Sequence, residues 1–551
     1  MSKDGAMTPN PPPVKANVDQ PITLSPYSSA LVQSVKTIPD QPKPDENTKL
    51  TVSQTVSFMA IAYEKVRNAI EYREDHLIRR AAIERILRRR LAMNASGKGE
   101  SENLLRELTW ARYFPNGSLD EDDIDHVQNI IDKYLLLRKV VVTGRDNNIK
   151  KYLYDFFIDM LTCEIEETLS PSTTFRDASF NYFLYQTLRQ KIHIEELTEE
   201  QKDAYFLVAL EKAYRKSDSS YQRYHLFTTF YKPLSEYTPE ELANFTSKLP
   251  QIFKRIDDMI KNPYVERLQK FAKKQLPPYL ILFEIMKDKK GKVDDIFKSR
   301  ALLWNEVDLT CREKYQQASS KLKTLAFKSL IYIFVTKMLF AIILEYPVSL
   351  WLYNEVHWSS IAINSLFPPI LMMIIVLFFK LPGDDNTQRI YYRIIDIIDS
   401  NKEFETTKVM NLTSKSKIKK PVLVFGFTIF YTLTFFITLF LIHEILLLLS
   451  FNVISQLLFV FFVSVITFFS YRIKQVVNEY RLISKEQILT PLIDFFFMPI
   501  LSLGKFFSTQ LGRLNFFIVI FDFIIEAPFK LIIEVVEEWI SFVKARKEEI
   551  A

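Results

Sequence analysis

The chain is 551 residues long, 48% hydrophobic and 25% charged, with a formal net charge of +6. Chains of this length divide into two or more folded units, and so small a charge on so many residues does not by itself indicate a nucleic-acid partner. Charged residues crowd the first 320 positions, whereas the 45 phenylalanines become denser toward the end. The composition therefore predicts two parts that face different solvents.

Glycine is scarce, with 10 residues in the whole chain, against an average usage of about 7%. Tight turns and phosphate-binding loops need glycine where φ is positive, so an all-α fold is predicted, with Lys139–Gly144 (KVVVTG) as the one strand-like exception. The two cysteines, Cys163 and Cys311, are too far apart in sequence to suggest a metal pair or a disulfide framework. They fit a reducing compartment.

The first 48 residues contain nine prolines and are expected to form a disordered tail. This end of the chain has no apolar h-region, so no cleavable signal peptide is expected. A cytosolic all-helical domain is predicted to follow, over residues 49–322. Its helix start signals are capping boxes at Ser118–Glu121, Thr198–Gln201 and Thr238–Glu241.

A long amphipathic helix is predicted over Thr51–Met93, because apolar residues recur there at mostly helical spacing. Its end carries six arginines that form a candidate anionic-partner patch: Arg79, Arg80, Arg85, Arg88, Arg89 and Arg90. Such a patch suits lipid headgroups, RNA phosphates or an acidic protein. The more common outcome is a solvated helix face.

Motifs for catalysis are missing from the sequence. The Gly-Lys-Gly string in Asn94–Ser101 lacks the spacing and the preceding strand of a phosphate-binding loop, and we read it as a helix linker. The histidines, His76, His126, His193, His225, His357 and His443, form no pair at helical metal-ligand spacing. We therefore expect no enzyme activity, no metal and no cofactor.

Four apolar runs are long enough to cross a membrane: Leu325–Leu344, Ile361–Phe379, Val422–Ile442 and Val453–Ser470. They define a first transmembrane pair (323–380), a basic cytosolic connection (381–420) and a second transmembrane pair (421–471). Lysine and arginine flank the spans on one side and are missing from Glu345–Ser360 and His443–Gln456. The positive-inside rule then puts both chain ends in the cytoplasm, with a bacterial plasma membrane as the simplest location.

Polar residues inside these runs are candidate functional groups. Lys337 lies within the first run, and its expected partners are Glu444 or Glu345. His443 and Glu444 end the third run and are read as interfacial unless that span shifts outward. Pro368 and Pro369 are expected to kink the second span. For Lys337 the alternative is a side chain that snorkels to the interface.

Residues 472–551 are predicted to form amphipathic C-terminal helices that lie in the interface or re-enter the membrane. In Phe516–Ile540 the polar stripe is mainly acidic, which favours docking over recruitment by anionic lipid. A spanning segment at Leu514–Ile525 stays open as an alternative. Ile390–Asp399 is a smaller candidate for an amphipathic helix.

Two functions fit this organisation. The first is a membrane-anchored helical scaffold, whose partners would be the lipid bilayer and either another protein or a second copy of the chain. The second is a small transporter or channel component that uses Lys337 and the kinked second span. No nucleic-acid partner is expected.

Overall fold

The computed structural model describes residues 20–38, 50–52, 74–401, 410–412, 421–482 and 490–513, and the single residues 57, 58, 60, 61, 64, 535, 539, 542, 543 and 546. Most of these residues are helical. Two three-residue strands, β1 (Ile192–Ile194) and β2 (Met410–Leu412), pair in one sheet. The all-α prediction is therefore confirmed.

The chain divides into two compact units. Among the described residues, unit 1 contains 20–25, 274–401, 412, 421–482 and 490–513, and unit 2 contains those within 26–273, 410–411 and those within 535–546. The division falls inside α12 (Pro263–Asp288). The expected domain end at residue 322 lies within α14 (Arg300–Phe340), which has no break at that point.

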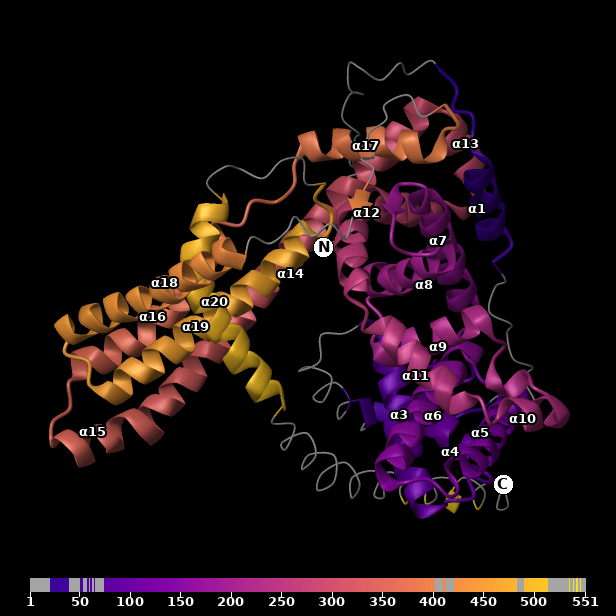
Figure 1. Cartoon of the computed structure of the whole chain (residues 1–551), viewed down its shortest axis with the longest axis horizontal. Helices are drawn as coiled ribbons and strands as arrows, with labels where there is room; N and C mark the ends of the chain where they lie inside the picture. The colour runs from indigo at the N-terminus through magenta and orange to yellow at the C-terminus, as the bar shows by residue number, and fades with distance from the viewer. Residues whose placement is uncertain are drawn as a thin grey trace. The chain divides into compact units, whose positions relative to one another are not determined.

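Unit 2 is a cluster of helices around α6. Its elements are α1 (Pro26–Lys36), α3 (Asp75–Met93), α4 (Glu100–Trp110), α5 (Glu121–Val142), α6 (Asn147–Thr168), α7 (Pro171–Arg189), β1, α8 (Glu199–Leu210), η1 (Glu211–Arg215), α9 (Ser219–Phe230), η2 (Leu234–Glu236), α10 (Pro239–Phe245), α11 (Leu249–Ile260) and the first part of α12. Helix α6 packs against α3, α5 and α9 (Figure 1), so its side chains from Phe156 to Glu166 are buried on every face.

The local start signals act mostly as expected. Thr198 and Thr238 cap α8 and α10 through reciprocal capping boxes with Gln201 and Glu241. At α5 the capping box is formed instead by Asp120 and Asp123, because the helix begins two residues later than a Ser118 cap would place it.

Two local expectations differ from the structure. Lys139–Val142 is the last turn of α5 rather than a strand, since Val141 packs into the helical core. Thr143 and Gly144, the latter with φ +77°, lie beyond the helix. Within the expected disordered tail, Pro26–Lys36 forms α1, because Leu31, Val32 and Val35 make an apolar stripe that packs on α7. Residues 1–19 and 39–49 lie outside the described residues, as do most of 53–73 in the expected long helix.

Unit 1 contains the apolar helices and a smaller polar helical part. Its elements are the second part of α12, η3 (Lys290–Lys292), α13 (Val293–Lys298), α14, η4 (Ala341–Glu345), α15 (Tyr346–Tyr353), α16 (Trp358–Leu377), α17 (Asp384–Ile398), α18 (Pro421–Leu448), α19 (Val453–Asn478) and α20 (Thr490–Arg513). Ile390–Asp399, expected to be amphipathic, lies in α17. Its apolar face is buried against α14, where Tyr391 packs edge-on against Trp304.

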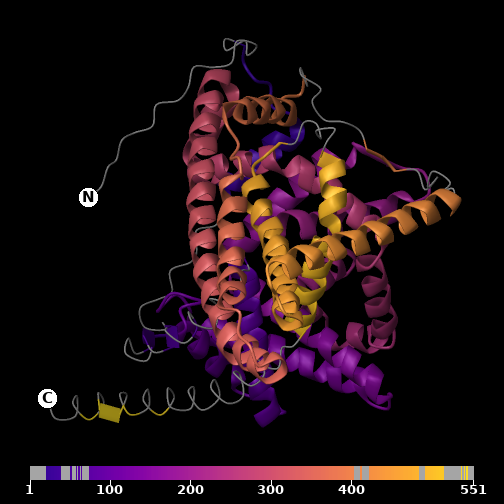
Figure 2. The same ribbon diagram turned by 90° about the vertical axis from the view of Figure 1, so that its left-hand side faces the viewer.

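Four helical stretches in the described part of the chain are long and apolar enough to cross a membrane: Arg300–Leu352, Trp358–Leu377, Phe425–Leu448 and Val453–Ser470. Each overlaps one of the four predicted runs. The first is part of a much longer helix, and the third extends beyond the predicted end at Ile442 to include His443 and Glu444. Helix α14 lies along α16, and α16 packs on α19 (Figure 2). Helix α20 packs against both α19 and α18. Phe516–Ile540 and Leu514–Ile525 lie almost wholly outside the described residues.

Candidate functional site

A lysine and a glutamate are fully buried among the apolar helices of unit 1. Nζ of Lys337 lies 3.6 Å from Oε2 of Glu345, and neither side chain is exposed to solvent. The ammonium group also faces the ring of Phe462, 5.0 Å from its centroid. Taking two charges out of water costs several kcal/mol per ion before their attraction offsets it, so this pair is the least expected feature of an apolar bundle.

A π-helical turn brings these two residues to one face. Lys337 lies on α14 and Glu345 ends η4, where the N–H of Tyr346 donates to the carbonyl of Ala341. In a regular α-helix, residues eight apart are about 80° out of phase. The extra residue of the π turn makes them equivalent to residues seven apart, about 20° out of phase, so the side chains line up. Single π turns are frequent at functional sites.

The second and fourth spans complete the site. Nδ2 of Asn364, on α16, donates to Oε1 of Glu345 at 2.8 Å and to the carbonyl of Ser455, on α19, at 3.1 Å. Asn364 is fully buried. Three helices therefore hold one polar cluster of Lys337, Glu345 and Asn364. Together with Ser365, the buried residue that follows Asn364 in α16, we name it the Lys337 site.

Several atoms of this site have no hydrogen-bond partner within the described part of the chain: Nζ of Lys337, Oε2 of Glu345, Oδ1 of Asn364 and Oγ of Ser365. Pro368 and Pro369 leave further backbone acceptors without a donor, because proline has no N–H to donate. The carbonyls four residues earlier, those of Asn364 and Ser365, therefore lack their usual helical donor. The two prolines expected to kink the span lie within α16, which continues through them, and both are buried.

The other candidate residues of the third span lie apart from this site. Glu444 and His443 are both exposed on α18, and Nδ1 of His443 contacts Oε1 of Gln456 at 2.7 Å. Of the two partners expected for Lys337, the structure brings Glu345 to it. The sequence alone offered both Glu444 and Glu345 as partners of Lys337, because the phase shift from a π turn is not visible in a hydropathy pattern.

The six arginines of the candidate anionic-partner patch contact carboxylates of their own unit. Arg79 pairs with Glu166, Arg80 with Glu84 and Asp218, Arg85 with Glu64, Arg88 with Glu84 and Asp155, Arg89 with Glu107, and Arg90 with Glu100 and Glu107. Arg80 and Arg90 are almost completely buried. These charges therefore serve the packing of α3 rather than form a free basic surface.

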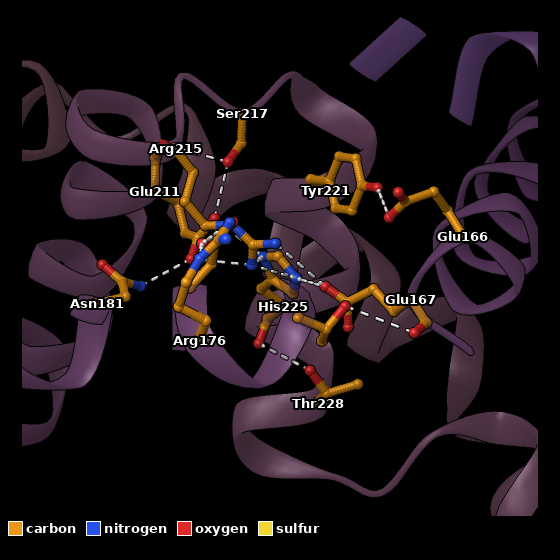
Figure 3. A network of polar contacts seen from close by, with 12 residues as sticks. Glu166, Glu167, Arg176, Asn181, Glu211, Arg215, Ser217, Tyr221, His225 and Thr228 are labelled. Carbon is orange, nitrogen blue, oxygen red and sulfur yellow. Dashed lines mark hydrogen bonds and ion pairs between the residues drawn. The ribbon is translucent and has the colours of Figure 1, made fainter. Parts of the chain in front are cut away.

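Unit 2 holds a second polar cluster, around His225 (Figure 3). Nε2 of His225 lies 2.6 Å from Oε1 of Glu167, and its Nδ1 lies 2.9 Å from Oε2 of Glu211. Arg215 contacts both carboxylates, at 3.5 and 4.0 Å. Glu211 and Arg215 come from η1, which is also a π-helical turn. Sequence reasoning treated His225 as an isolated histidine, because its partners come from two other elements, α6 and η1.

Charge, rather than burial, decides protonation in the His225 cluster. Burial alone lowers the pKa of His225, but the carboxylates of Glu211 and Glu167 raise it to about 9. Burial raises the pKa of Glu211, and the charges of His225 and Arg215 reverse this and lower it to about 2. The cluster at neutral pH is thus an imidazolium and a guanidinium between two carboxylates.

The part of the chain that the structure describes contains no group of three or more His, Cys, Asp or Glu side chains arranged to hold a metal ion. Cys163 and Cys311 are both buried free thiols. No known protein family, curated protein or solved structure matches this chain.

Proposed function

We propose that the protein is a multi-pass integral membrane protein and that its apolar helices form an ion- or proton-handling component of a transporter or channel. The observation that supports this is the Lys337 site, in which an ion pair and an asparagine are wholly buried within helices of membrane-spanning character. Ionisable groups inside a membrane are costly, and they mark ion and proton pathways.

The proposed topology has both chain ends in the cytoplasm. Lysines and arginines flank the inner ends of the spans. Trp351 and Trp358, which are 80% and 68% exposed, suit the opposite interface, where aromatic rings gather. Asn364 lies six residues beyond Trp358, about 9 Å inside that interface. A bacterial plasma membrane remains the simplest assignment.

Four spans are few for enclosing a path by themselves, so we propose that the chain works as an oligomer or with a membrane partner. Helix α18 offers the surface for this. Most of its large apolar side chains are exposed on the surface of this chain. Val422, Phe425 and Phe436 are each more than 60% exposed. In the proposed membrane, lipid or a helix of another subunit covers them.

The test is ion flux in proteoliposomes, read with a pH-sensitive dye and with an imposed membrane potential. Lys337→Met is expected to reduce flux to the level of protein-free vesicles. Lys328→Met is the matched control, because Lys328 lies on the same helix with an exposed side chain and is expected to keep the wild-type flux. Equal flux from both variants, or none from the wild type, would count against this function.

The scaffold is a second candidate function. It is favoured by exposed apolar side chains on unit 2: Leu136 and Val140 on α5, and Phe175 and Tyr182 on α7, all more than 40% exposed. Apolar surface of this kind is used in protein contacts. A photo-crosslinking residue at Tyr182 in the full-length protein should capture a partner in cells, whereas one at exposed Glu102 on α4 should not. Capture at both positions, or at neither, would argue against the scaffold.

A further inference from the structure

The surroundings of the Lys337 site are polar on one side only. From Glu345, hydrogen bonds lead through Asn364 to the carbonyl of Ser455. The N–H of Ser455 donates to Oδ1 of Asn452 at 2.8 Å, and Nδ2 of Asn452 donates to Oγ of Ser349 at 2.7 Å. This polar chain reaches the turn that joins α18 to α19 at Asn452, which is half-buried rather than fully covered. Ser349 lies within α15 and is buried.

On the opposite side the bundle is closed by apolar side chains. The buried cluster consists of Leu322, Ile333, Met372, Ile466 and Ile473, with Val376, Phe379, Leu381 and Phe469 packed against it. Ile333 lies one helical turn before Lys337, and Met372 lies about two turns beyond Asn364. The hydroxyl of Ser470 also contacts this cluster, donating to Sδ of Met372 at 3.1 Å. The cluster otherwise offers water few partners, so it separates the site from the other end of the helices.

Within the described residues, the atoms of the site without hydrogen-bond partners are two acceptors, Oε2 of Glu345 and Oδ1 of Asn364, one donor, Nζ of Lys337, and the hydroxyl of Ser365, which can donate or accept. The ammonium group of Lys337 already occupies the position that a bound cation would take beside Glu345. The species that fits the remaining chemistry is therefore a proton, carried to the carboxylate by water. Because burial removes much of the hydration that favours the charged forms, the ion pair comes closer in free energy to the neutral pair, in which the ammonium proton of Lys337 has moved to the carboxylate of Glu345.

We propose that Glu345 and Lys337 form a proton-binding pair, and that water carries the proton between this pair and the outer side of the membrane along the polar residues Asn364, Ser455 and Asn452. In the uptake step a hydronium ion gives its proton to the carboxylate of Glu345, which leaves a carboxylic acid and one water molecule, and the ammonium of Lys337 is unchanged. Release reverses the step. The side of access rests on the proposed topology, whereas proton binding at the site does not require transport.

Among the residues that the structure describes, few other ionisable groups bear on this pair. Helices α16 and α19 contribute uncharged side chains to it, Asn364, Ser365 and Phe462. On α18, His443 and Glu444 are exposed. Tyr346 follows Glu345 directly, and its ring packs against Trp358. A titration seen at the site would therefore report on Lys337 and Glu345.

The first experiment is an infrared titration of the full-length protein in proteoliposomes, from about pH 4 to about pH 10, which brackets the ordinary pKa values of a carboxyl and an amine. A carboxylic-acid C=O band that appears on acidification in the wild type and is missing in Glu345→Gln is expected. In Lys337→Met the band should persist to higher pH, because the carboxylate has lost its counter-ion. No band in the wild type, or the same band in Glu345→Gln, would overturn the proposal.

The second experiment tests the route. Ser365→Cys and Met372→Cys are each treated with a membrane-impermeant thiol reagent on the outer side of oriented vesicles. Ser365→Cys should react, and Met372→Cys, in the apolar cluster, should not; the wild type, with both cysteines buried, sets the background. Ser455→Cys is a second reporter if Ser365→Cys does not fold. Reaction of Met372→Cys alone, or of none of the variants, would overturn outer access. If both experiments succeed and flux is absent, the proton site survives and the transport function fails.

Discussion

Both ring nitrogens of His225 face carboxylates, Nδ1 that of Glu211 at 2.9 Å and Nε2 that of Glu167 at 2.6 Å. Neither nitrogen is left to act as a free base. This geometry suits a structural imidazolium that joins α6, η1 and α9, and it explains why a buried histidine stays charged.

The His225 cluster should give unit 2 a defined pH dependence. The pKa of His225 is raised from 6.5 to about 9. Its contribution to the stability of unit 2 is therefore complete below pH 6.5 and is lost as the pH rises through 9. The pKa of Glu211 is lowered from 4.5 to about 2, so its contribution is present above pH 4.5 and is lost as the pH falls through 2. Hydrogen exchange in α6 and α9, corrected for intrinsic rates, should show greatest protection between about pH 4.5 and pH 6.5.

The control for this dependence is His225→Gln, which should lower protection at pH 6 and remove the alkaline decline. His193 provides a matched comparison, because it is exposed on β1 and His193→Gln should leave the profile unchanged. A profile for His225→Gln that still declines between pH 6.5 and pH 9 would show that another group is responsible.

Glu107 and Glu102 lie on the same helix, α4, in different surroundings. Glu107 is buried and pairs with Arg89 and Arg90, whereas Glu102 is half exposed and pairs with Arg106. Removing one partner of a buried pair costs about 3–5 kcal/mol, and an exposed pair contributes about 0–1 kcal/mol. Glu107→Gln should therefore lower the free energy of unfolding of unit 2 by about 3 kcal/mol or more, and Glu102→Gln by less than about 1 kcal/mol, in urea titrations. Similar losses would mean that the buried arginines find other partners.

The membrane-length helices were predictable because apolar length is a local property of the sequence. The fourth predicted run, Val453–Ser470, coincides with the observed stretch, and the second differs from Trp358–Leu377 by a few residues at each end. Helix caps at Thr198 and Thr238 were equally local. By contrast, α1 was hidden by the prolines around it, since its three buried apolar residues gain their stability from contact with α7.

The polar clusters were not predictable in the same way. Lys337 was recognisable as a charge in an apolar run, but its pairing depends on a π turn that adds one residue to the helical register. His225 gave no signal, because Glu167 and Glu211 reach it only after α6, η1 and α9 have packed. Both clusters contain a π-helical turn, so irregular helical register is the feature that sequence periodicity misses here.

The coupling between Lys337 and Glu345 can be measured with a double-mutant cycle in lipid bicelles. Lys337→Met and Glu345→Gln should each destabilise the bundle by about 3–5 kcal/mol, because each leaves a buried charge without its partner. The double variant should lose much less than the sum, since no charge is left buried. Steric trapping gives the free energies, and Lys328→Met should change them by less than about 0.5 kcal/mol. Additive losses would show that the two residues do not interact.

Gly504 permits the close packing of α20 on α19. A methyl group at this position would overlap the carbonyl oxygen of Ser464 and Cβ of Phe468, and neither backbone can yield without moving a helix. Gly504→Ala should therefore destabilise the bundle by about 1–3 kcal/mol. Gly426 on α18 is the matched control, because a methyl group there meets nothing within 4 Å. Gly426→Ala should be neutral or slightly stabilising, since alanine is the better helix former.

The measurement is thermal unfolding of the full-length protein in one detergent, together with limited proteolysis of the segment around α20. Gly504→Ala should unfold at a lower temperature and expose α20 to cleavage, while Gly426→Ala should match the wild type in both assays. Because α20 also meets α18 through the hydroxyls of Ser502 and Tyr431, 3.0 Å apart, loosening α20 should increase proteolysis of α18 as well. Cleavage confined to α20 would show that α18 is held by something other than this helix.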